Sequence, residues 1–296
     1  MAKILVTGAN GQVGQELQFL TKQFPNDFVF TDTTELDITK SDNVNAFFRN
    51  HNFDYCINCA AFTAVDKAET AIKLATSVNV VGVKNLAQAC LFNNTFLIQL
   101  STDYVYHNNQ NTPFNEGDPT NPQGVYAATK LEGDLAALKI NIATMIIRTS
   151  WVYSSYQHNF VKTMLRLGKE RDQLSVVFDQ IGTPTYARDL ANTILTTISQ
   201  IEENTTKQSN CYGVFHYSNE GVTSWYDFAQ AIFKLANINC KLTPIESVDY
   251  PTPAKRPPFS VLNKAKIKQT LGITIPHWQD GLERCLLALN INKKHL

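Results

Sequence analysis

The chain has 296 residues, is 44% hydrophobic, and balances 26 acidic against 26 basic side chains. This length predicts one large domain or two unequal ones, and the balanced charge excludes a general attraction to nucleic acid or to anionic membranes. Because no apolar run approaches the roughly 20 residues of a membrane span and the start carries no basic leader, we expect a cytoplasmic protein.

Apolar runs alternate with helical patterns along the first half of the chain. The pattern predicts strands at 3–8, 27–32, 53–61, 95–102 and 143–150, and helices at 11–24, 43–51, 71–92 and 125–138. Such alternation is typical of parallel β-α-β units with right-handed crossovers, and the near-continuous apolar strands suit a sheet that is covered on both faces. We therefore predict an α/β fold, with a Rossmann-like, doubly wound parallel sheet.

After residue 150 the alternation loosens into turns and a proline cluster, YPTPAKRPP at 250–258. A helix is predicted at 189–198, followed by a strand at 213–218 that rejoins the first sheet. We expect a dinucleotide-binding domain at 1–150, rejoined by about 186–217. A smaller α+β substrate-binding domain is expected at 151–185 and 218–296.

The segment GANGQVG places Gly8, Gly11 and Gly14 between the first strand and the first helix. Glycines there permit a tight turn and let the backbone approach a pyrophosphate, which the free N–H groups at the helix start attract. This arrangement predicts a site for NADH or NADPH.

Three residues at or just after the end of the second strand are candidates for binding the adenosine half of the cofactor. Asp32 ends that strand, where its carboxylate can accept hydrogen bonds from the ribose and repel a 2′-phosphate. NADH is therefore expected, and tolerance of NADPH stays open. Asp37 and Ile38 are placed to touch adenine, although Asp32 and Asp37 could equally cap a turn or helix.

Tyr126 and Lys130 lie four positions apart in GVYAATKLEG, on one face of the predicted helix. At an effective dielectric of about 20, the ammonium would lower the pKa of the phenol by about two units. Tyr126 could then donate a proton at neutral pH. A surface tyrosine beside a solvated lysine is the alternative, because both residue types are common in this chain.

Several motifs occur in a characteristic order: the glycine loop, NCAAFTAVDKAE, STDYVY, YAATK, RTSWVY and YPTPAKRP. With them the chain resembles the extended short-chain dehydrogenase/reductase family, and within it the reductases that complete dTDP-L-rhamnose synthesis. The resemblance runs from Lys3 to about Gly281. It implies NAD(P)H-dependent reduction of the C4 keto group of dTDP-4-dehydro-L-rhamnose, which supplies a nucleotide sugar for cell-wall polysaccharide.

The resemblance also implies roles for individual residues. Tyr126 would be the proton donor, Thr102 a second hydrogen-bond donor to the developing alkoxide, and Lys130 a partner of the phenol and of the nicotinamide ribose. The cofactor-binding set is Gly8, Asn10, Gly11, Gln12, Val13, Gly14, Asp32, Asp37, Ile38, Ala60, Ala61, Thr63, Tyr126 and Lys130. The substrate-binding set is Val65, Asp66, Thr102, Asp103, Tyr104, Trp151, Asn159, Gln180 and Arg256, with Phe160 beside them.

Two substrate candidates have specific alternatives. The planar fork of Arg256 suits a diphosphate, but a solvated arginine in a proline turn is as well supported. Trp151 could contact the deoxysugar nucleotide or belong to the core between domains.

Some members of the family bind magnesium through three glutamates. Here only Glu16 matches, while Arg188 and Ala288 stand at the other places, and this set cannot hold a hard cation. We predict no metal, and expect a monomer or a weak homodimer. Cys56 and Cys59 have C-x-x-C spacing, but residues three apart on a strand point to opposite faces, which favours buried thiols over a zinc or redox site.

Rival functions stay open at this point. A dehydratase of the same superfamily would need a carboxylate where Tyr104 stands. An epimerase uses the same Tyr/Lys chemistry but recycles its cofactor. A non-catalytic, cofactor-bound partner protein is also possible, because the regulatory β subunit of methionine adenosyltransferase resembles the same subgroup.

Overall fold

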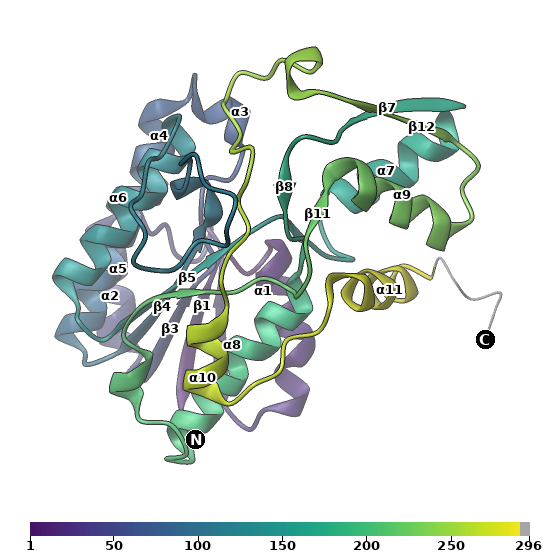
Figure 1. Cartoon of the computed structure of the whole chain (residues 1–296). Coiled ribbons are helices and arrows are strands. Elements are labelled where there is room, and N and C mark those ends of the chain that lie inside the picture. The colour runs from purple at the N-terminus through teal and green to yellow at the C-terminus, as the bar shows by residue number, and fades with distance from the viewer. Residues whose placement is uncertain (291–296) are drawn as a thin grey trace.

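A sheet of six parallel strands, in the order β10-β5-β4-β3-β1-β2, organises the computed structural model, which describes residues 1–290 (Figure 1). The strands are β1 Lys3–Thr7, β2 Asp27–Thr31, β3 Tyr55–Asn58, β4 Phe96–Thr102, β5 Thr144–Thr149 and β10 Gly213–His216. The order reverses between β1 and β3, and in such sheets a crevice opens at the carboxyl ends of the strands. The predicted α/β doubly wound sheet is confirmed.

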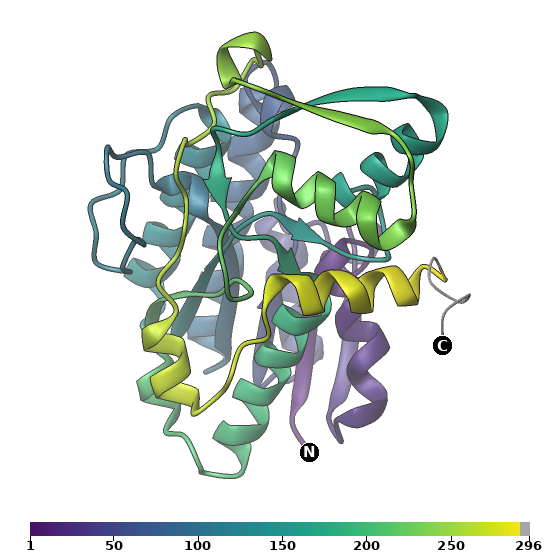
Figure 2. The same cartoon turned by 45° about the vertical axis from the view of Figure 1, so that its right-hand side comes forward.

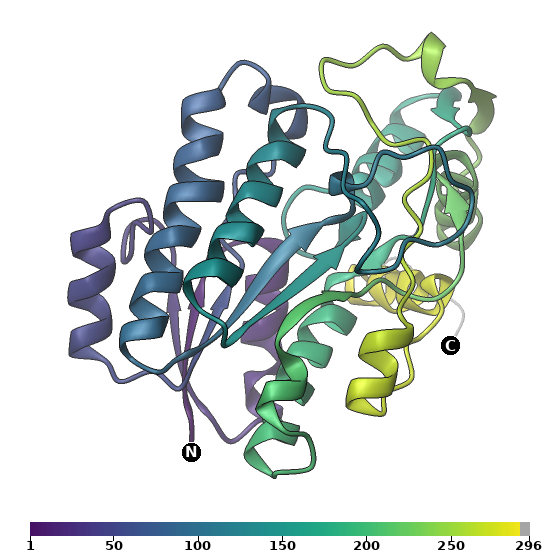
Figure 3. The ribbon, with the colours of Figure 1, turned by 60° about the vertical axis from the view of Figure 1, so that its left-hand side comes forward.

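Helices cover both faces of this sheet (Figure 3). One face carries α1 Gln12–Leu20, α8 Ala187–Glu202 and α10 Ala265–Leu271, and the other carries α2 Ser41–Asn50, α5 Val83–Phe92 and α6 Val125–Ile140. Ile4 and Val6 point into the first layer and Leu5 into the second, as the period of two along a strand requires. The central strands are largely apolar because both of their faces are buried, whereas the edge strand β2 is only partly buried.

The helix predicted at 71–92 is interrupted. It consists of α4 Ile72–Thr76, a π-helical turn at Ser77–Gly82, and α5. The wide turn brings the carbonyl of Asn79 against α6, where a Cβ on Gly133 would collide with it. The side chain of Asn79 accepts a hydrogen bond from the Phe62 N–H (2.9 Å) and donates to the Thr129 hydroxyl (3.2 Å). It thereby joins the loop after β3 to the helix α6.

A second hydrophobic core lies apart from the six-stranded sheet, and the elements that build it gather at the right of Figure 2. It is built from α7 Phe160–Glu170, β7 Gln173–Val177, α9 Trp225–Ala236, β12 Lys241–Ile245 and α11 Trp278–Ala288. Smaller elements are β6 Val152–Tyr153, β8 Ile181–Gly182, β9 Thr185–Tyr186, β11 Thr223–Ser224, α3 Val65–Ala68, and 3-10 turns at Thr21–Gln23, Asp103–Val105, Gln208–Cys211 and Ser247–Asp249. Residues 291–296, the end of the predicted second domain, lie outside the described part of the chain.

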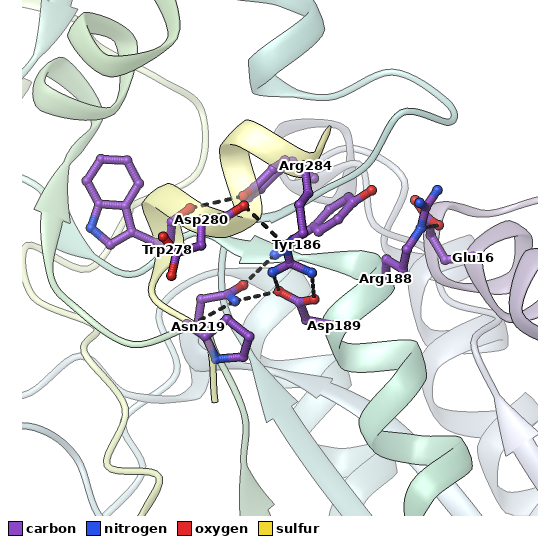
Figure 4. Close-up of polar contacts among 10 residues, drawn as sticks. Glu16, Tyr186, Arg188, Asp189, Asn219, Trp278, Asp280 and Arg284 are labelled. Atoms are coloured by element: carbon purple, nitrogen blue, oxygen red, sulfur yellow. Dashed lines mark hydrogen bonds and ion pairs between the residues drawn. The ribbon is translucent and has the colours of Figure 1, made fainter. Parts of the chain in front are cut away.

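An ion pair fastens α11 to α8 (Figure 4). Nη1 and Nη2 of Arg284 donate to the two carboxylate oxygens of Asp189 over 2.5 and 2.7 Å, and the Asn219 amide donates to the same carboxylate over 2.7 Å. This contact lies away from the crevice.

The cysteines and the helices bear on two further predictions. All six cysteines are free. Cys56 and Cys59 pack toward opposite faces of the sheet, as predicted, but Cys56 is buried and Cys59 only half-buried, so the predicted burial of both thiols holds for Cys56 alone. Within residues 1–290, none of the helices has the length and apolar character needed to cross a membrane.

Candidate active site

A cleft of about 1090 Å³ opens at the carboxyl ends of the strands and continues to the second core. It brings together most of the predicted site residues. Those lining it are Gly8, Asn10, Gly11, Gln12, Val13, Asp32, Asp37, Ile38, Ala60, Ala61, Thr63, Val65, Thr102, Asp103, Tyr104, Tyr126, Lys130, Trp151 and Asn159. Five predicted residues are not part of its lining: Gly14, Asp66, Phe160, Gln180 and Arg256.

The glycine loop has the geometry of an anion cradle. Gly8 has a φ of +65°, and a Cβ there would lie 2.6 Å from the Ala60 nitrogen. A Cβ on Gly14 would lie 2.5 Å from the carbonyl oxygen of Gly8. The start of α1 can therefore lie close to the end of β1 only because position 14 has no side chain. Gly11 precedes α1 and offers no side-chain cap, which leaves the first N–H groups of the helix available to a phosphate.

The acidic residues after β2 are bound to the backbone. Asp32 accepts hydrogen bonds from the N–H groups of Asn10 (3.1 Å) and Thr33 (2.8 Å), and so braces the glycine loop. Asp37 accepts from the N–H and the hydroxyl of Thr39, and the hydroxyl bond is the main cause that lowers the pKa of its carboxyl. The turn-capping alternative for Asp37 is therefore formed in the structure.

Thr102, Tyr126 and Lys130 meet where β4 ends and α6 begins. The helix starts after Gly124, which has a φ of +88°, and a carboxylate oxygen of Glu69 accepts from the N–H of Val125 over 2.8 Å. Lys130 is buried, and its Nζ donates to the Leu100 carbonyl over 2.6 Å. The first contact anchors the start of α6, and the second holds the Lys130 side chain in place.

The predicted lowering of the Tyr126 pKa by Lys130 is wrong. Burial raises the pKa of the phenol to about 12, and a hydrogen bond with Thr102 opposes the shift only in part. Burial likewise lowers the pKa of Lys130, with Asp134 opposing it. Desolvation therefore sets the direction of the Tyr126 shift, because charge is costly in a dry site, and Lys130 is not among its main causes. The phenol keeps its proton at neutral pH, which is the form that a proton donor requires.

Two buried aspartates surround the predicted catalytic residues. Asp103 lines the cleft, one of its carboxylate oxygens has no partner within residues 1–290, and burial raises its pKa to about 7. Asp134 lies behind the site, accepts from the Ser101 hydroxyl, and stands 3.8 Å from Nε of Arg148. Asp134 is therefore the anion that accompanies two buried cations, Lys130 and Arg148.

The far wall of the cleft is aromatic. Trp151, with a φ of +47°, stacks on Trp225 with ring centroids 3.6 Å apart. Gln180 does not line the cleft but accepts from the indole N–H of Trp225 over 3.2 Å, so it orients the stack. Phe160 packs against the same ring, with centroids 4.7 Å apart. Asn159 caps α7 and donates to Gln12 over 3.0 Å, which joins this wall to the glycine loop.

Sequence reasoning missed several residues of the cleft. Trp225 opens α9 without a recognisable motif, and only its position directly after a capping serine could have marked it. Gln157 and His158 also line the cleft, and the amide of Gln157 donates to the Asn10 carbonyl over 2.7 Å.

Asp66 and Arg256 form an ion pair at the rim. Nη2 of Arg256 donates to one carboxylate oxygen of Asp66 over 2.7 Å, and Nη1 donates to the other over 3.2 Å. The pair joins α3 to the proline-rich segment 250–258. Arg256 is therefore not a freely solvated arginine.

The donors around Glu16 do not fit the magnesium site of the family. Glu16 is fully buried and accepts from Nε of Arg188 (2.7 Å) and from the Ser154 hydroxyl (2.6 Å), as Figure 4 shows for the arginine. The positively charged guanidinium already occupies the position where a metal cation would bind Glu16, and it would repel such a cation. In the described part of the chain, no three His, Cys, Asp or Glu side chains gather as a metal-binding group would.

Comparison with known sequences adds to this picture. The family model of the RmlD substrate binding domain matches residues 2–291. The dTDP-4-dehydrorhamnose reductase of Aggregatibacter actinomycetemcomitans is 41% identical over 291 residues, which cover 96% of this chain and 98% of the relative. That of Escherichia coli K12 is 38% identical and covers 97% of both chains.

Comparison with solved structures gives the same family. A dTDP-4-dehydrorhamnose reductase from Clostridium acetobutylicum superposes with a TM-score of 0.91 at 43% identity, covering 97% of this chain and 99% of that one. The Bacillus anthracis dTDP-4-dehydrorhamnose reductase, solved in complex with NADP, has a TM-score of 0.91 at 36% identity and the same coverage.

Proposed function

Because the chain belongs to the RmlD family of dTDP-4-dehydrorhamnose reductases, we propose that it reduces the C4 keto group of dTDP-4-dehydro-L-rhamnose with NAD(P)H, forming dTDP-L-rhamnose. The observation that carries this function is a single cleft. One end of it is an anion cradle, its middle holds Thr102, Tyr126 and Lys130, and its far wall is a pair of stacked tryptophans.

The cofactor site fits a dinucleotide by the chemistry of its donors. Gly8, Gly11 and Gly14 leave room for a pyrophosphate at the start of α1, and Asp32 stands at the end of β2 where a ribose would lie. When bound there, the reduced nicotinamide supplies hydride to the substrate carbonyl. We assign to Lys130, which lines the cleft, the contact with the nicotinamide ribose.

The chain's own residues supply the proton. Tyr126 remains protonated because burial raises its pKa, and we assign to it the delivery of that proton to the oxygen at C4. Thr102 donates a second hydrogen bond to the same oxygen, where negative charge develops. Lys130 favours the phenolate left behind, because a nearby cation stabilises it.

The sugar and nucleotide occupy the side of the cleft that faces the second core. Trp151 and Trp225 offer an aromatic face, and Asp103 offers an unpaired carboxylate oxygen to a sugar hydroxyl. The diphosphate lies toward Arg256, because a guanidinium suits phosphate oxygens.

The rival functions have less support. Tyr104, not a carboxylate, packs edge-on against Tyr126 with ring centroids 5.8 Å apart, which disfavours a dehydratase. A regulatory partner protein would not need the buried Lys130, Asp134 and Arg148 behind the phenol.

The direct test follows nicotinamide absorbance with dTDP-4-dehydro-L-rhamnose and each reduced cofactor. A reductase consumes one reduced nicotinamide per sugar, whereas an epimerase consumes none. Tyr126→Phe should retain cofactor binding and lose about a hundred- to ten-thousandfold in turnover. Tyr217→Phe removes the same atom from a buried tyrosine outside the cleft and should retain activity. Unchanged turnover in Tyr126→Phe removes the phenol from the mechanism.

We also propose the organisation around this activity. We propose 1–150 with 186–217 as the cofactor-binding domain and 151–185 with 218–296 as the substrate-binding domain, because β10 returns to the sheet and the second core is separate. Within the second range, α10 is an exception, because it packs on the sheet of the first. Six free cysteines suit the reducing cytoplasm. We propose a monomer or a weak homodimer, because Arg188 neutralises the charge of Glu16 within the same chain.

A further inference from the structure

Arg256 keeps one complete edge of its guanidinium free while it is paired with Asp66. Its Nη1 and Nη2 each donate to one oxygen of Asp66, and Nη1 also donates to the Ala254 carbonyl over 3.0 Å. This end-on pairing leaves Nε–H and the second N–H of Nη2 without a partner in the described residues. These two groups lie side by side along one edge of the planar group, which is the geometry that binds two oxygens of a phosphate.

Asp66 is itself held in place by the proline-rich segment 250–258. Asp66 lies on α3, the short helix that comes after β3. Its carboxylate accepts a hydrogen bond from the N–H of Ala254 over 3.2 Å, in addition to those from Arg256. The hydrogen bond from Arg256 is the main cause that lowers the pKa of the carboxyl, so it stays ionised. Neither side chain lines the cleft, but Val65 and Tyr104, which stand beside them, do. Asp66 therefore contacts the arginine and not the cleft space.

We propose that Asp66 is a positioning residue, which fixes the plane of Arg256 so that the free Nε–Nη2 edge faces the diphosphate of the nucleotide sugar. The inference rests on the proposed function for the identity of the ligand. An arginine on a proline-rich segment would otherwise have to be ordered when the ligand binds. That ordering typically weakens affinity by about two- to tenfold. The segment runs past α3 in Figure 1, and the ion pair with Asp66 of α3 places Arg256 beside this helix.

The opposite arrangement makes a different prediction. If Asp66 instead competed with the diphosphate for the arginine, then removing its charge would free the guanidinium and tighten nucleotide binding. The sign of the change in affinity therefore separates positioning from competition.

The experiment measures binding of dTDP and of thymidine to the full chain by calorimetry. Asp66→Asn should weaken dTDP binding by up to about tenfold and leave thymidine binding unchanged, because thymidine has no phosphate. Arg256→Gln and Arg256→Lys should each weaken dTDP binding at least as much, since neither side chain presents the paired edge. Asp66→Asn added to Arg256→Gln should cause no further loss. Unchanged or tighter dTDP binding by Asp66→Asn overturns the proposal, as does a wild-type chain that does not bind dTDP.

A matched control comes from the pair of Asp189 and Arg284, which has the same end-on geometry and lies away from the cleft (Figure 4). Asp189→Asn should lower the melting temperature without changing dTDP affinity. If it weakens dTDP binding as much as Asp66→Asn does, the effect is general loosening and the proposal is wrong. Glu170→Gln, which breaks the exposed pair with Arg166, serves the same purpose should Asp189→Asn fail to fold.

Failure of the proposed function would look different. A chain that binds dTDP with the predicted pattern of variants but does not oxidise NAD(P)H with the keto sugar would retain the positioning role and lose the reductase assignment.

Discussion

Replacing Arg188 by methionine is expected to destabilise the fold strongly. The guanidinium donates to Glu16 over 2.7 Å, and it also stacks over the Phe19 ring at 4.0 Å. The carboxylate of Glu16 has no exposure to water, so without the arginine only the Ser154 hydroxyl would face it. An isolated buried charge is costly, because water no longer solvates it.

The contacts set the size of the effect. At 2.7 Å and an effective dielectric of about 20, the gross attraction between the two charges is about 6 kcal/mol. Desolvation cancels part of it, and removing one partner of a buried pair costs about 3–5 kcal/mol. With an unfolding entropy of about 2 cal/mol/K per residue, a chain of 296 residues should lose about 5–8 °C in melting temperature.

Thermal unfolding of four proteins tests this reasoning: wild type, Arg188→Met, Glu16→Gln, and the double variant. The double variant should recover much of the loss of Arg188→Met, because it contains no buried charge at this place. Magnesium should not raise, and a chelator should not lower, the melting temperature of the wild type. A loss below about 1 kcal/mol in Arg188→Met, or additive losses in the double variant, would refute the account.

Three further substitutions probe other parts of the molecule. Burial and Arg148 lower the pKa of His216 to about 3, so between about pH 6.5 and 3 only the unfolded chain binds this proton. As the pH falls through this window, the free energy of unfolding of the wild type should therefore decrease by about 1.4 kcal/mol more per pH unit than that of His216→Gln. Urea titrations at several pH values measure this difference. An equal pH dependence in the two proteins would contradict the prediction. Gly14→Ala should weaken NAD(P)H binding at least tenfold, measured by nicotinamide fluorescence, because its methyl group meets the Gly8 carbonyl; an unchanged affinity would mean that the loop adapts. Trp225→Ala should raise KM for the sugar nucleotide about tenfold or more and spare cofactor affinity, and equal effects on both ligands would contradict its place in the substrate wall.

The parallel sheet was predictable because its signals are local. The central strands are short, largely apolar runs with both faces buried, and Gly8, Gly11 and Gly14 mark the turn that follows the first of them. The strand β10 was also visible, although its pairing with β5 is distant in sequence, because Val214 and Phe215 continue the same apolar pattern.

Properties that depend on several distant groups could not be read in this way. The pKa of Tyr126 was predicted from its spacing to Lys130 alone, but desolvation by the whole fold decides its direction. The partner of Arg256 lies 190 positions away, and no periodicity connects it with Asp66. Trp225 reaches the cleft because of the way in which α9 packs. The helical periodicity of the sequence does not reveal this packing.

The contact between the π-helical turn and α6 has a consequence for how this protein can vary. A methyl group at Gly133 would push the helix off the carbonyl of Asn79, and the phenol and ammonium of the same helix would move with it. A substitution at position 133 would then resemble a catalytic lesion in a genetic screen, although this glycine touches no ligand. The widened turn and the missing side chain should be inherited together, since a lineage that regularised the turn would be free to fill position 133.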